Sequence, residues 1–244
     1  MVEQLKDKVL DKKSIEAAGK NFFEKLINSL PDYLKKRFIP ALIMMPSAII
    51  IIYTTPLVFE LFIIIMAVLM AFEWITIAKT EEETNMWRML GLIYILIPCF
   101  SLVYLRGTTN GSDIILWLCL VVWATDIGGL VVGVNVGGPK LAPTISPNKT
   151  WSGLGGGVLA SMFIGLITSL MFKEGAMFFI VFSGIIAIIE QMSDLLESKF
   201  KRYFGVKDSG NLIPGHGGIM DRVDGFTLTA PIVAILALFS NSIF

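Results

Sequence analysis

The sequence is poor in charged residues, in cysteine and in histidine. Only 16% of its 244 residues are charged, whereas soluble domains carry about 25%. The two cysteines lie inside apolar runs and there is a single histidine, so the chain offers neither a disulfide framework nor a CxxC metal site. No polar linker divides the apolar part of the chain, which argues against a string of soluble domains. A chain that is 55% hydrophobic and has these shortages is typical of one integral membrane domain.

Apolar segments fill the chain after residue 37. A helix that crosses a bilayer needs about 20 apolar residues, and seven segments approach this length. They are residues 38–54, 56–78, 88–105, 113–134, 153–172, 176–198 and 219–243. The expected fold class is therefore an all-α integral membrane protein with about seven transmembrane helices, in which residues 38–244 form a single polytopic membrane domain.

The first 37 residues are charged, with nine basic and six acidic side chains, and no cleavable signal peptide is expected. Between Ile15 and Leu34, apolar residues recur at helical spacing. This pattern predicts an N-terminal amphipathic helix that lies on the membrane surface. A solvated, partly disordered terminus explains the same composition, and the sequence leaves both interpretations open.

The basic residues predict how the helices are oriented. If the N-terminus lies in the cytoplasm and the seven segments alternate in direction, 18 of the 20 basic residues lie on the cytoplasmic side. Only Arg106 and Lys173 lie on the other side. Because this bias follows the positive-inside rule, residues 135–152 and 199–218 are expected at the cytoplasmic surface and Phe244 on the far side.

Carboxylates inside apolar segments are costly and usually mark functional sites. Six that stand out are Glu60, Glu73, Asp126, Glu190, Asp194 and Glu197. On a helix, Glu190, Asp194 and Glu197 would share one face with Lys201. This spacing predicts a row of polar residues that leads out of the membrane. The alternative is a buried polar seam between helices. Asp126 precedes the polar loop 135–152 and is a further candidate. Glu60 and Glu73 belong to no motif, so we expect them in helix packing or at the interface.

Two polar stretches carry residues suited to phosphate and metal chemistry. In residues 198–224, cations and carboxylates surround the run Pro214 to Gly218, whose backbone could approach an anion closely. In residues 135–152, three prolines exclude a regular helix. Lys149 could hold a triphosphate there, together with the hydroxyls of Ser146 and Thr150. The next helix is expected to start between Trp151 and Gly153, where its first amides would add to an anion site.

These stretches resemble a known family. The ordered set Ser198, Lys201-Arg202, Lys207-Asp208, Pro214 to Gly218, Asp221-Arg222 and Asp224 is similar to the C-terminal signature of the phosphatidate cytidylyltransferases, or CDP-diacylglycerol synthases. Ser146-Pro147 and Lys149-Thr150 resemble a second block of that family. The chain departs from the pattern at Ser152, where members usually carry Glu. It also has Gly128-Gly129-Leu130 after Asp126, where members usually carry an aromatic residue.

The resemblance implies transfer of a cytidylyl group from CTP to phosphatidate, giving CDP-diacylglycerol and pyrophosphate for phospholipid biosynthesis. The expected metal is Mg²⁺, with a second, monovalent ion left open, and the expected ligands are Asp194, Asp221, Asp126 and Asp224. Residues expected to act in catalysis are Asp194, Asp221, Lys201, Arg202 and His216. Residues expected to bind substrate are Ser146, Lys149, Thr150, Ser198, Lys207, Arg222, Gly217 and Gly218. Of all these residues, Lys149 is expected to bind CTP. Lys201 and Arg202 are expected to bind the headgroup of phosphatidate.

The expected partners are CTP, phosphatidate and membrane lipids, with no nucleic acid; a homodimer is left open. The expected location is a bacterial-type inner membrane, with the active site on the cytoplasmic side. Two other functions share some of these features. Ion-coupled transporters also have intramembrane carboxylates and interrupted helices, although this chain shows no internal repeat. A CTP-dependent lipid kinase would need a similar nucleotide site but would phosphorylate an alcohol.

Overall fold

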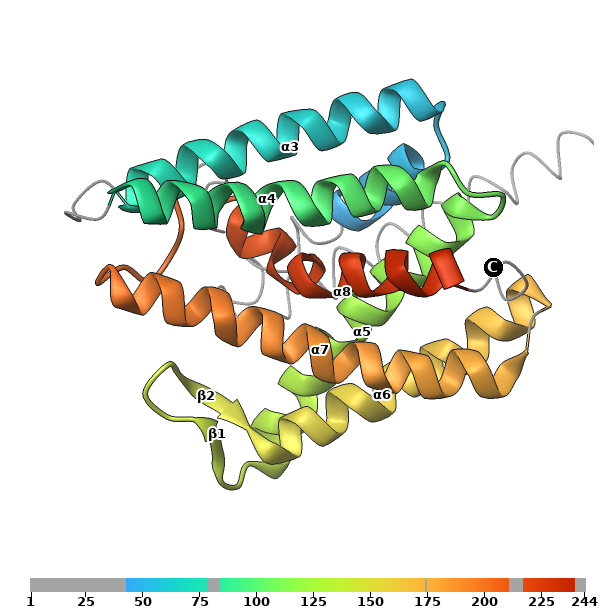
Figure 1. The fold of residues 1–244 in the computed structure, drawn as a ribbon. Coiled ribbons are helices and arrows are strands. Elements are labelled where there is room, and N and C mark those ends of the chain that lie inside the picture. Colours follow the sequence, from blue (N-terminus) through green and yellow to red (C-terminus); the bar gives the residue numbers. More distant parts are fainter. Residues whose placement is uncertain (1–42, 79–83, 174, 211–216, 240–244) are drawn as a thin grey trace, which may run out of the picture. The chain divides into compact units, whose positions relative to one another are not determined.

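The computed structural model describes residues 43–78, 84–173, 175–210 and 217–239, and helices make up most of them (Figure 1). The long helices are α3 (Pro56–Ile77), α4 (Thr84–Arg106), α5 (Gly111–Val136), α6 (Trp151–Phe172), α7 (Ala176–Tyr203) and α8 (Met220–Phe239). In the described part of the chain, these six are long and apolar enough to cross a membrane. The prediction of an all-α integral membrane protein is confirmed, and six of the seven expected spans correspond to these helices.

The first expected span, 38–54, is described only in part. Its described residues form the shorter apolar helix Ile43–Ile52. The amphipathic helix expected within residues 1–37 lies outside the described residues. The chain divides into two compact units, Met1–Ala48 and Ile49–Phe244, and the arrangement given below is that of the second unit.

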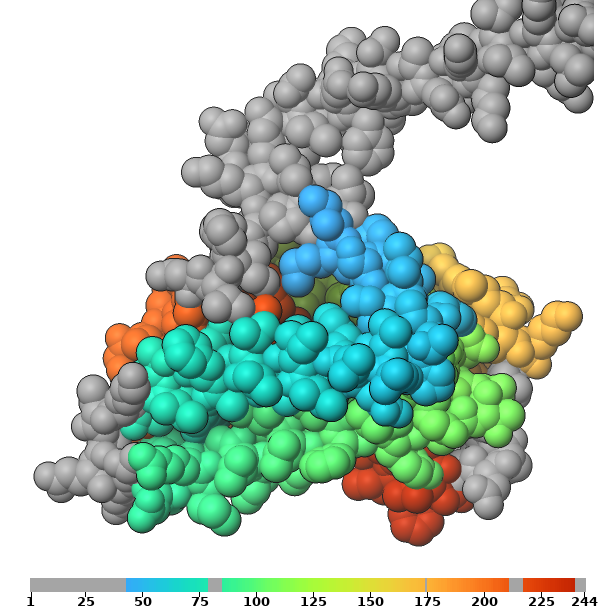
Figure 2. Space-filling view, turned by 90° about the horizontal axis from the view of Figure 1, so that it is seen from above, coloured from blue at the N-terminus to red at the C-terminus, as the bar shows by residue number. Residues whose placement is uncertain are grey.

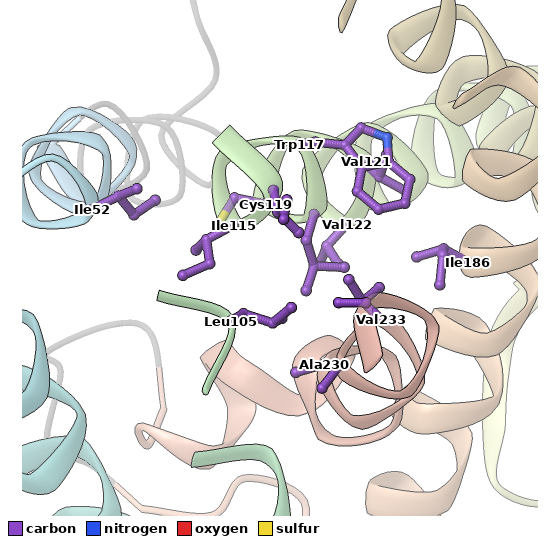
Figure 3. Packing of buried hydrophobic residues seen from close by; sticks show 14 of the residues in the cluster. Ile52, Leu105, Ile115, Trp117, Cys119, Val121, Val122, Ile186, Ala230 and Val233 are labelled. Carbon is purple, nitrogen blue, oxygen red and sulfur yellow. The ribbon is translucent and has the colours of Figure 1, made fainter. Parts of the chain in front are cut away.

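The helices of this unit pack in a chain of neighbours. Helix α3 packs against α4, α4 against α8, α8 against α7, α7 against α6, and α6 against α5. Figure 2 shows α3 and α4 side by side across one face. The core gathers around α5, where Trp117 and Val121 point toward Ile186 of α7 and Val233 of α8 (Figure 3). The indole nitrogen of Trp117 donates a hydrogen bond of 2.9 Å to the hydroxyl of Ser183, which satisfies its polar atom inside the core.

Small residues bring α5 and α6 into close contact. A Cβ atom at Gly156 would lie 2.4 Å from the side chain of Val132, and one at Gly128 would lie 2.6 Å from Ala160. Helices in membranes often approach through such small residues, because lipid provides no hydrophobic drive for packing. The glycine run that starts at Gly153 therefore packs α6 against α5 at Gly156.

A short β-hairpin connects α5 to α6. Strand β1 (Lys140–Ala142) pairs antiparallel with β2 (Ser146–Thr150), with Ala142 opposite Ser146 and Lys140 opposite Thr150. The prolines do exclude a helix here, as predicted, but the sequence analysis did not predict strands. Pro147 lies in β2, and a proline is tolerated in a strand at the edge of a sheet. The hairpin fixes where Lys149 emerges from the bundle.

The two ends of the bundle differ in what they hold. At one end, Tyr53 donates to a carboxylate oxygen of Asp113 at 2.6 Å, and Arg106 donates to the carbonyl oxygen of Thr54 at 2.7 Å. At the other end, β2 meets the last turns of α7, and the first turn of α8 meets α3. Both polar stretches of the sequence therefore lie at the same end, as the alternation of spans predicted.

Candidate active site

Lys149 of β2 reaches across to α7. Its Nζ atom forms an ion pair with Oδ2 of Asp194 and donates a hydrogen bond of 3.0 Å to Oε1 of Gln191. The other oxygen of Asp194 accepts a hydrogen bond of 3.2 Å from the hydroxyl of Ser198. Three predicted site residues from segments about 45 residues apart in sequence are thus brought together.

Lys201 forms a second ion pair at the same end of α7. Its Nζ atom lies 2.5 Å from Oδ1 of Asp221 and 3.3 Å from Oε1 of Glu197. The other oxygen of Asp221, Oδ2, accepts hydrogen bonds from the backbone amides of Ser209 at 2.9 Å and Gly218 at 2.8 Å. Asp221 is therefore held from both sides, by a lysine through one oxygen and by backbone amides through the other.

The polar row predicted on α7 is confirmed. Glu190, Glu197 and Lys201 are buried, and Asp194 is half-buried between them. Asp126 of α5 interacts with Glu190, and Asp224 of α8 interacts with Glu197. Two carboxyl groups facing each other cannot both carry an uncompensated charge at low cost. Each pair therefore requires a proton or a nearby cation.

This set of donors fits a divalent cation that also binds a substrate phosphate. Among the residues that the structure describes, no three acidic, histidine or cysteine side chains form a preformed metal cluster. Mg²⁺ usually takes only one or two protein carboxylates and keeps waters and phosphate oxygens as its other ligands. Carboxylates outnumber the lysines that pair with them here, so a cation would relieve an existing excess of negative charge.

Several predicted residues lie apart from these pairs. Arg202 is exposed and donates to the carbonyl oxygen of Val206 at 2.9 Å, so it points away from its neighbour Lys201. Lys207 is also exposed. Arg222 is exposed too, but its charge interacts with the carboxyl group of Asp126. His216 lies outside the described residues. The structure thus separates Lys201 and Arg202, which the sequence analysis assigned to one headgroup.

Other predicted substrate-binding residues have structural contacts of their own. The hydroxyl of Thr150 accepts the backbone amide of Gly153 at 3.0 Å and so caps the start of α6, where the sequence predicted that helix to begin. Ser152 donates to the carbonyl oxygen of Gly137 and closes the base of the hairpin. Ser146 begins β2, which places it in the hairpin five residues before α6.

The glycines at positions 217 and 218 fill places that no side chain could occupy. Gly217 has a φ of 79°, in the region that favours glycine. A Cβ atom at Gly218 would lie 2.1 Å from the hydroxyl of Ser209 and 2.5 Å from both carboxylate oxygens of Glu73. These contacts account for both glycines without any ligand, and their assignment to substrate stays a prediction.

Glu73 was expected in helix packing or at the interface, and its contacts confirm a place in packing. The side chain is 3% exposed and accepts hydrogen bonds from Ser209 and from the residues at the start of α8. No motif surrounds Glu73, so its closeness to the candidate site was not predicted. The cost of burying a carboxylate was the signal that could have found it. Its partners lie at least 136 residues later in the chain.

Comparisons with known proteins identify the family of this chain. A sequence model of the cytidylyltransferase family matches residues 83–240. A phosphatidate cytidylyltransferase of Rickettsia bellii is 36% identical over 205 residues, which cover 81% of this chain and 87% of the relative. One of Rickettsia felis is 34% identical over 83% of this chain and 91% of its own. One of Brucella suis is 47% identical over 155 residues, covering 63% of this chain and 56% of the relative. The resemblance seen in the motifs is confirmed, and the chain belongs to the cytidylyltransferase family.

Proposed function

We propose that this protein transfers a cytidylyl group from CTP to phosphatidate and so makes CDP-diacylglycerol and pyrophosphate. The observation that carries the proposal is the meeting of two lysine–carboxylate pairs, Lys149–Asp194 and Lys201–Asp221, at one end of a membrane bundle. A site at the end of such a bundle is reachable both by a nucleotide from water and by a lipid phosphate from the membrane. The names of the relatives, all phosphatidate cytidylyltransferases, support the same reaction.

In the proposed reaction, a phosphate oxygen of phosphatidate attacks the α-phosphorus of CTP. The bond from that phosphorus to the oxygen that bridges to the β-phosphate breaks, and pyrophosphate leaves with the bonding electrons. The phosphate monoester is already anionic near neutral pH, so a strong general base is not required. Nucleotidyl transfer then depends mainly on positioning and on neutralising charge.

The two lysines divide these tasks in our proposal. Lys149 lies on the hairpin just before the start of α6 and would leave Asp194 to bind the triphosphate of CTP. Lys201 is held by Asp221 and Glu197 and would bind the lipid phosphate as a point charge. Arg202 is exposed and points away from Lys201, and it would contact the headgroup from the surface. Replacing Lys149 by Ala should therefore raise the KM for CTP more than the KM for phosphatidate.

We also propose that Asp194 and Asp221 bind Mg²⁺, with Asp126 and Asp224 as further candidates. When bound, the ion would supply neutralisation of charge on the phosphates. The variant Asp194→Asn keeps the shape of the side chain and removes its charge. We expect its rate to fall by at least about 100-fold, because a loss of a few kcal/mol of charge stabilisation corresponds to that factor. Rates measured across a Mg²⁺ titration check this, with Glu60→Gln as the control. Near-normal turnover of Asp194→Asn would exclude Asp194 as a ligand.

The proposed location is a bacterial-type inner membrane, with the site on the cytoplasmic side, where CTP is present. The positive-inside bias of the basic residues supports this orientation. A homodimer is compatible with the proposal but is not required by it, since both lysine–carboxylate pairs form within one chain.

Labelled CTP tests the proposed function directly. Membranes or purified protein are incubated with phosphatidate and CTP labelled at the α- or the γ-phosphate. The cytidylyltransferase reaction moves the α-label into lipid and leaves the γ-label in pyrophosphate. Transfer of the γ-label into lipid would instead indicate a lipid kinase. Transfer of neither label, by a protein that is folded, would contradict both enzymes and favour the transporter.

A further inference from the structure

Glu73 lies on α3, four residues before the end of that helix, and its carboxylate is buried against residues 209–210 and 218–220. Oε1 accepts the backbone amide of Ile219 at 2.7 Å, and Oε2 accepts the amide of Met220 at 2.9 Å. Oε2 also accepts the hydroxyl of Ser209 at 2.8 Å. All three donors are neutral. Hydrogen bonds from neutral donors to a carboxylate are of the strong, charge-assisted kind, and these three satisfy both oxygens of Glu73.

These contacts join two separate parts of the chain. Ser209 follows α7, whereas Ile219 immediately precedes α8 and Met220 is the first residue of that helix. Two successive amides at the start of a helix form a favourable place for an anion, because the positive end of the helix dipole lies there. Glu73 therefore fixes the first turn of α8 to the residues that follow α7.

The same residues orient Asp221. The hydroxyl of Ser209 lies 2.8 Å from Oε2 of Glu73 and 3.1 Å from Oδ2 of Asp221, so it stands between the two carboxylates. The amides of Ser209 and Gly218 also donate to Oδ2 of Asp221, as described above. Asp221 in turn holds Lys201 through its other oxygen. A continuous set of hydrogen bonds thus leads from α3 to Lys201.

The backbone packs closely around the carboxylate of Glu73. A Cβ atom at Gly218 would lie 2.5 Å from both of its oxygens, and one at Gly210 would lie 3.1 Å from Oε1. The backbone on both sides therefore approaches the carboxylate closely. A side chain with the same shape but with an NH₂ group in place of one oxygen would oppose a donor to a donor at Ile219 or Met220.

We propose that Glu73 is a positioning residue of the cytidylyl transfer reaction. Its carboxylate holds Ser209 and the start of α8 in the arrangement that orients Asp221 and, through Asp221, Lys201. This inference rests on the proposed function. It adds to the site a residue from α3, which lies ahead of the segment 83–240 matched by the family.

The test compares the wild type with Glu73→Gln and Glu60→Gln. Glu60 is a partly exposed residue of the same helix, about 20 Å away along the helix axis, so its replacement removes the same charge outside the site. Steady-state rates are measured with CTP and phosphatidate varied separately, alongside thermal unfolding of the detergent-extracted protein. We expect Glu73→Gln to lower kcat by at least about tenfold through Asp221 and to raise the KM for phosphatidate through Lys201. The KM for CTP should stay within about twofold of wild type, because Lys149 is not held by Glu73. Glu60→Gln should match the wild type.

A double-mutant cycle combines Glu73→Gln with Ser209→Ala and compares the two single variants with the double variant. It separates positioning from a general loss of stability. If Glu73 acts through Ser209, the double variant should lose less kcat/KM than the product of the two single losses, because the residues act as one unit. If the two effects were unrelated, the loss in kcat/KM of the double variant would equal the product of the two single losses. That result, or a wild-type kcat in Glu73→Gln, would overturn the proposal. If Glu73→Gln does not fold, Ser209→Ala decides alone, and an unchanged kcat in that variant overturns it. A wild-type protein that transfers no α-label would contradict the proposed function instead.

Discussion

The charged side chains of the candidate site lie in pairs, Lys149 with Asp194 and Lys201 with Asp221. The sequence singles out these four residues as candidates, because charged groups beside apolar segments are costly and suit phosphate chemistry. It does not predict how they pair, since the pairing depends on how α7, α8 and the hairpin pack. The donors to Glu73 could not be predicted either, because they lie far away in sequence.

Gly218 offers a test of the close packing around Glu73. In Gly218→Ala the new methyl group would overlap Ser209 and Glu73, so we expect the variant to be less stable by about 1–3 kcal/mol, as in other overpacked sites. The measurement is thermal unfolding in detergent, together with the rate of cytidylyl transfer.

Gly155→Ala is the matched control for that variant. Gly155 lies within α6, and a Cβ atom there would meet nothing within 4 Å. Alanine is favoured over glycine in a helix by about 0.5–1 kcal/mol, so this variant should be as stable as the wild type or more so. Equal unfolding temperatures for Gly218→Ala and Gly155→Ala would contradict the packing described for Gly218.

At the scale of elements, the boundaries of the helices were predictable and the hairpin was not. The apolar segments of the sequence begin and end within about five residues of helices α3 to α8. They do so because the thickness of the bilayer sets the length of a spanning helix. The strands β1 and β2 are only three and five residues long and contain a proline. They have no alternating apolar pattern, so the usual signal for a strand is missing.

The cap of α6 gives a prediction at this scale. Replacing Thr150 by Ala removes the hydroxyl that accepts the amide of Gly153, and we expect a loss of about 0.5–2 kcal/mol in unfolding free energy. Thr150→Ser keeps the oxygen and should retain most of the stability. Chemical or thermal unfolding of the two variants measures the difference. An Ala variant as stable as the Ser variant would show that the cap contributes nothing.

For the whole molecule, three described basic residues lie at the ends of the bundle that the sequence predicted for them. Arg106 lies at the end that holds Tyr53 and Asp113, and Lys149 and Lys201 lie at the end that holds the candidate site. The order of packing, with α8 between α4 and α7, could not be predicted. All these helices are apolar around most of their surface, so hydrophobic periodicity does not choose their neighbours.

Cysteine labelling tests this division across a real membrane. Single cysteines at Lys173 and Lys207, in a protein whose Cys99 and Cys119 are replaced by Ala, should label from opposite sides with a reagent that does not cross the membrane. Lys207 should react from the cytoplasmic side. Labelling of both positions from the same side would contradict the alternation of α6 and α7.

The link between α3 and α8 also bears on how this enzyme can be recombined with its relatives. The family match begins at residue 83, after α3 has ended. A chimera that exchanges only the matched segment would carry every recognisable motif into its new host but leave Glu73 behind. The activity of such a chimera would depend on whether the helix before the exchanged segment, which comes from the recipient, has a carboxylate at the turn that corresponds to Glu73. The functional module in this chain therefore begins at least one helix before the segment that the family model matches.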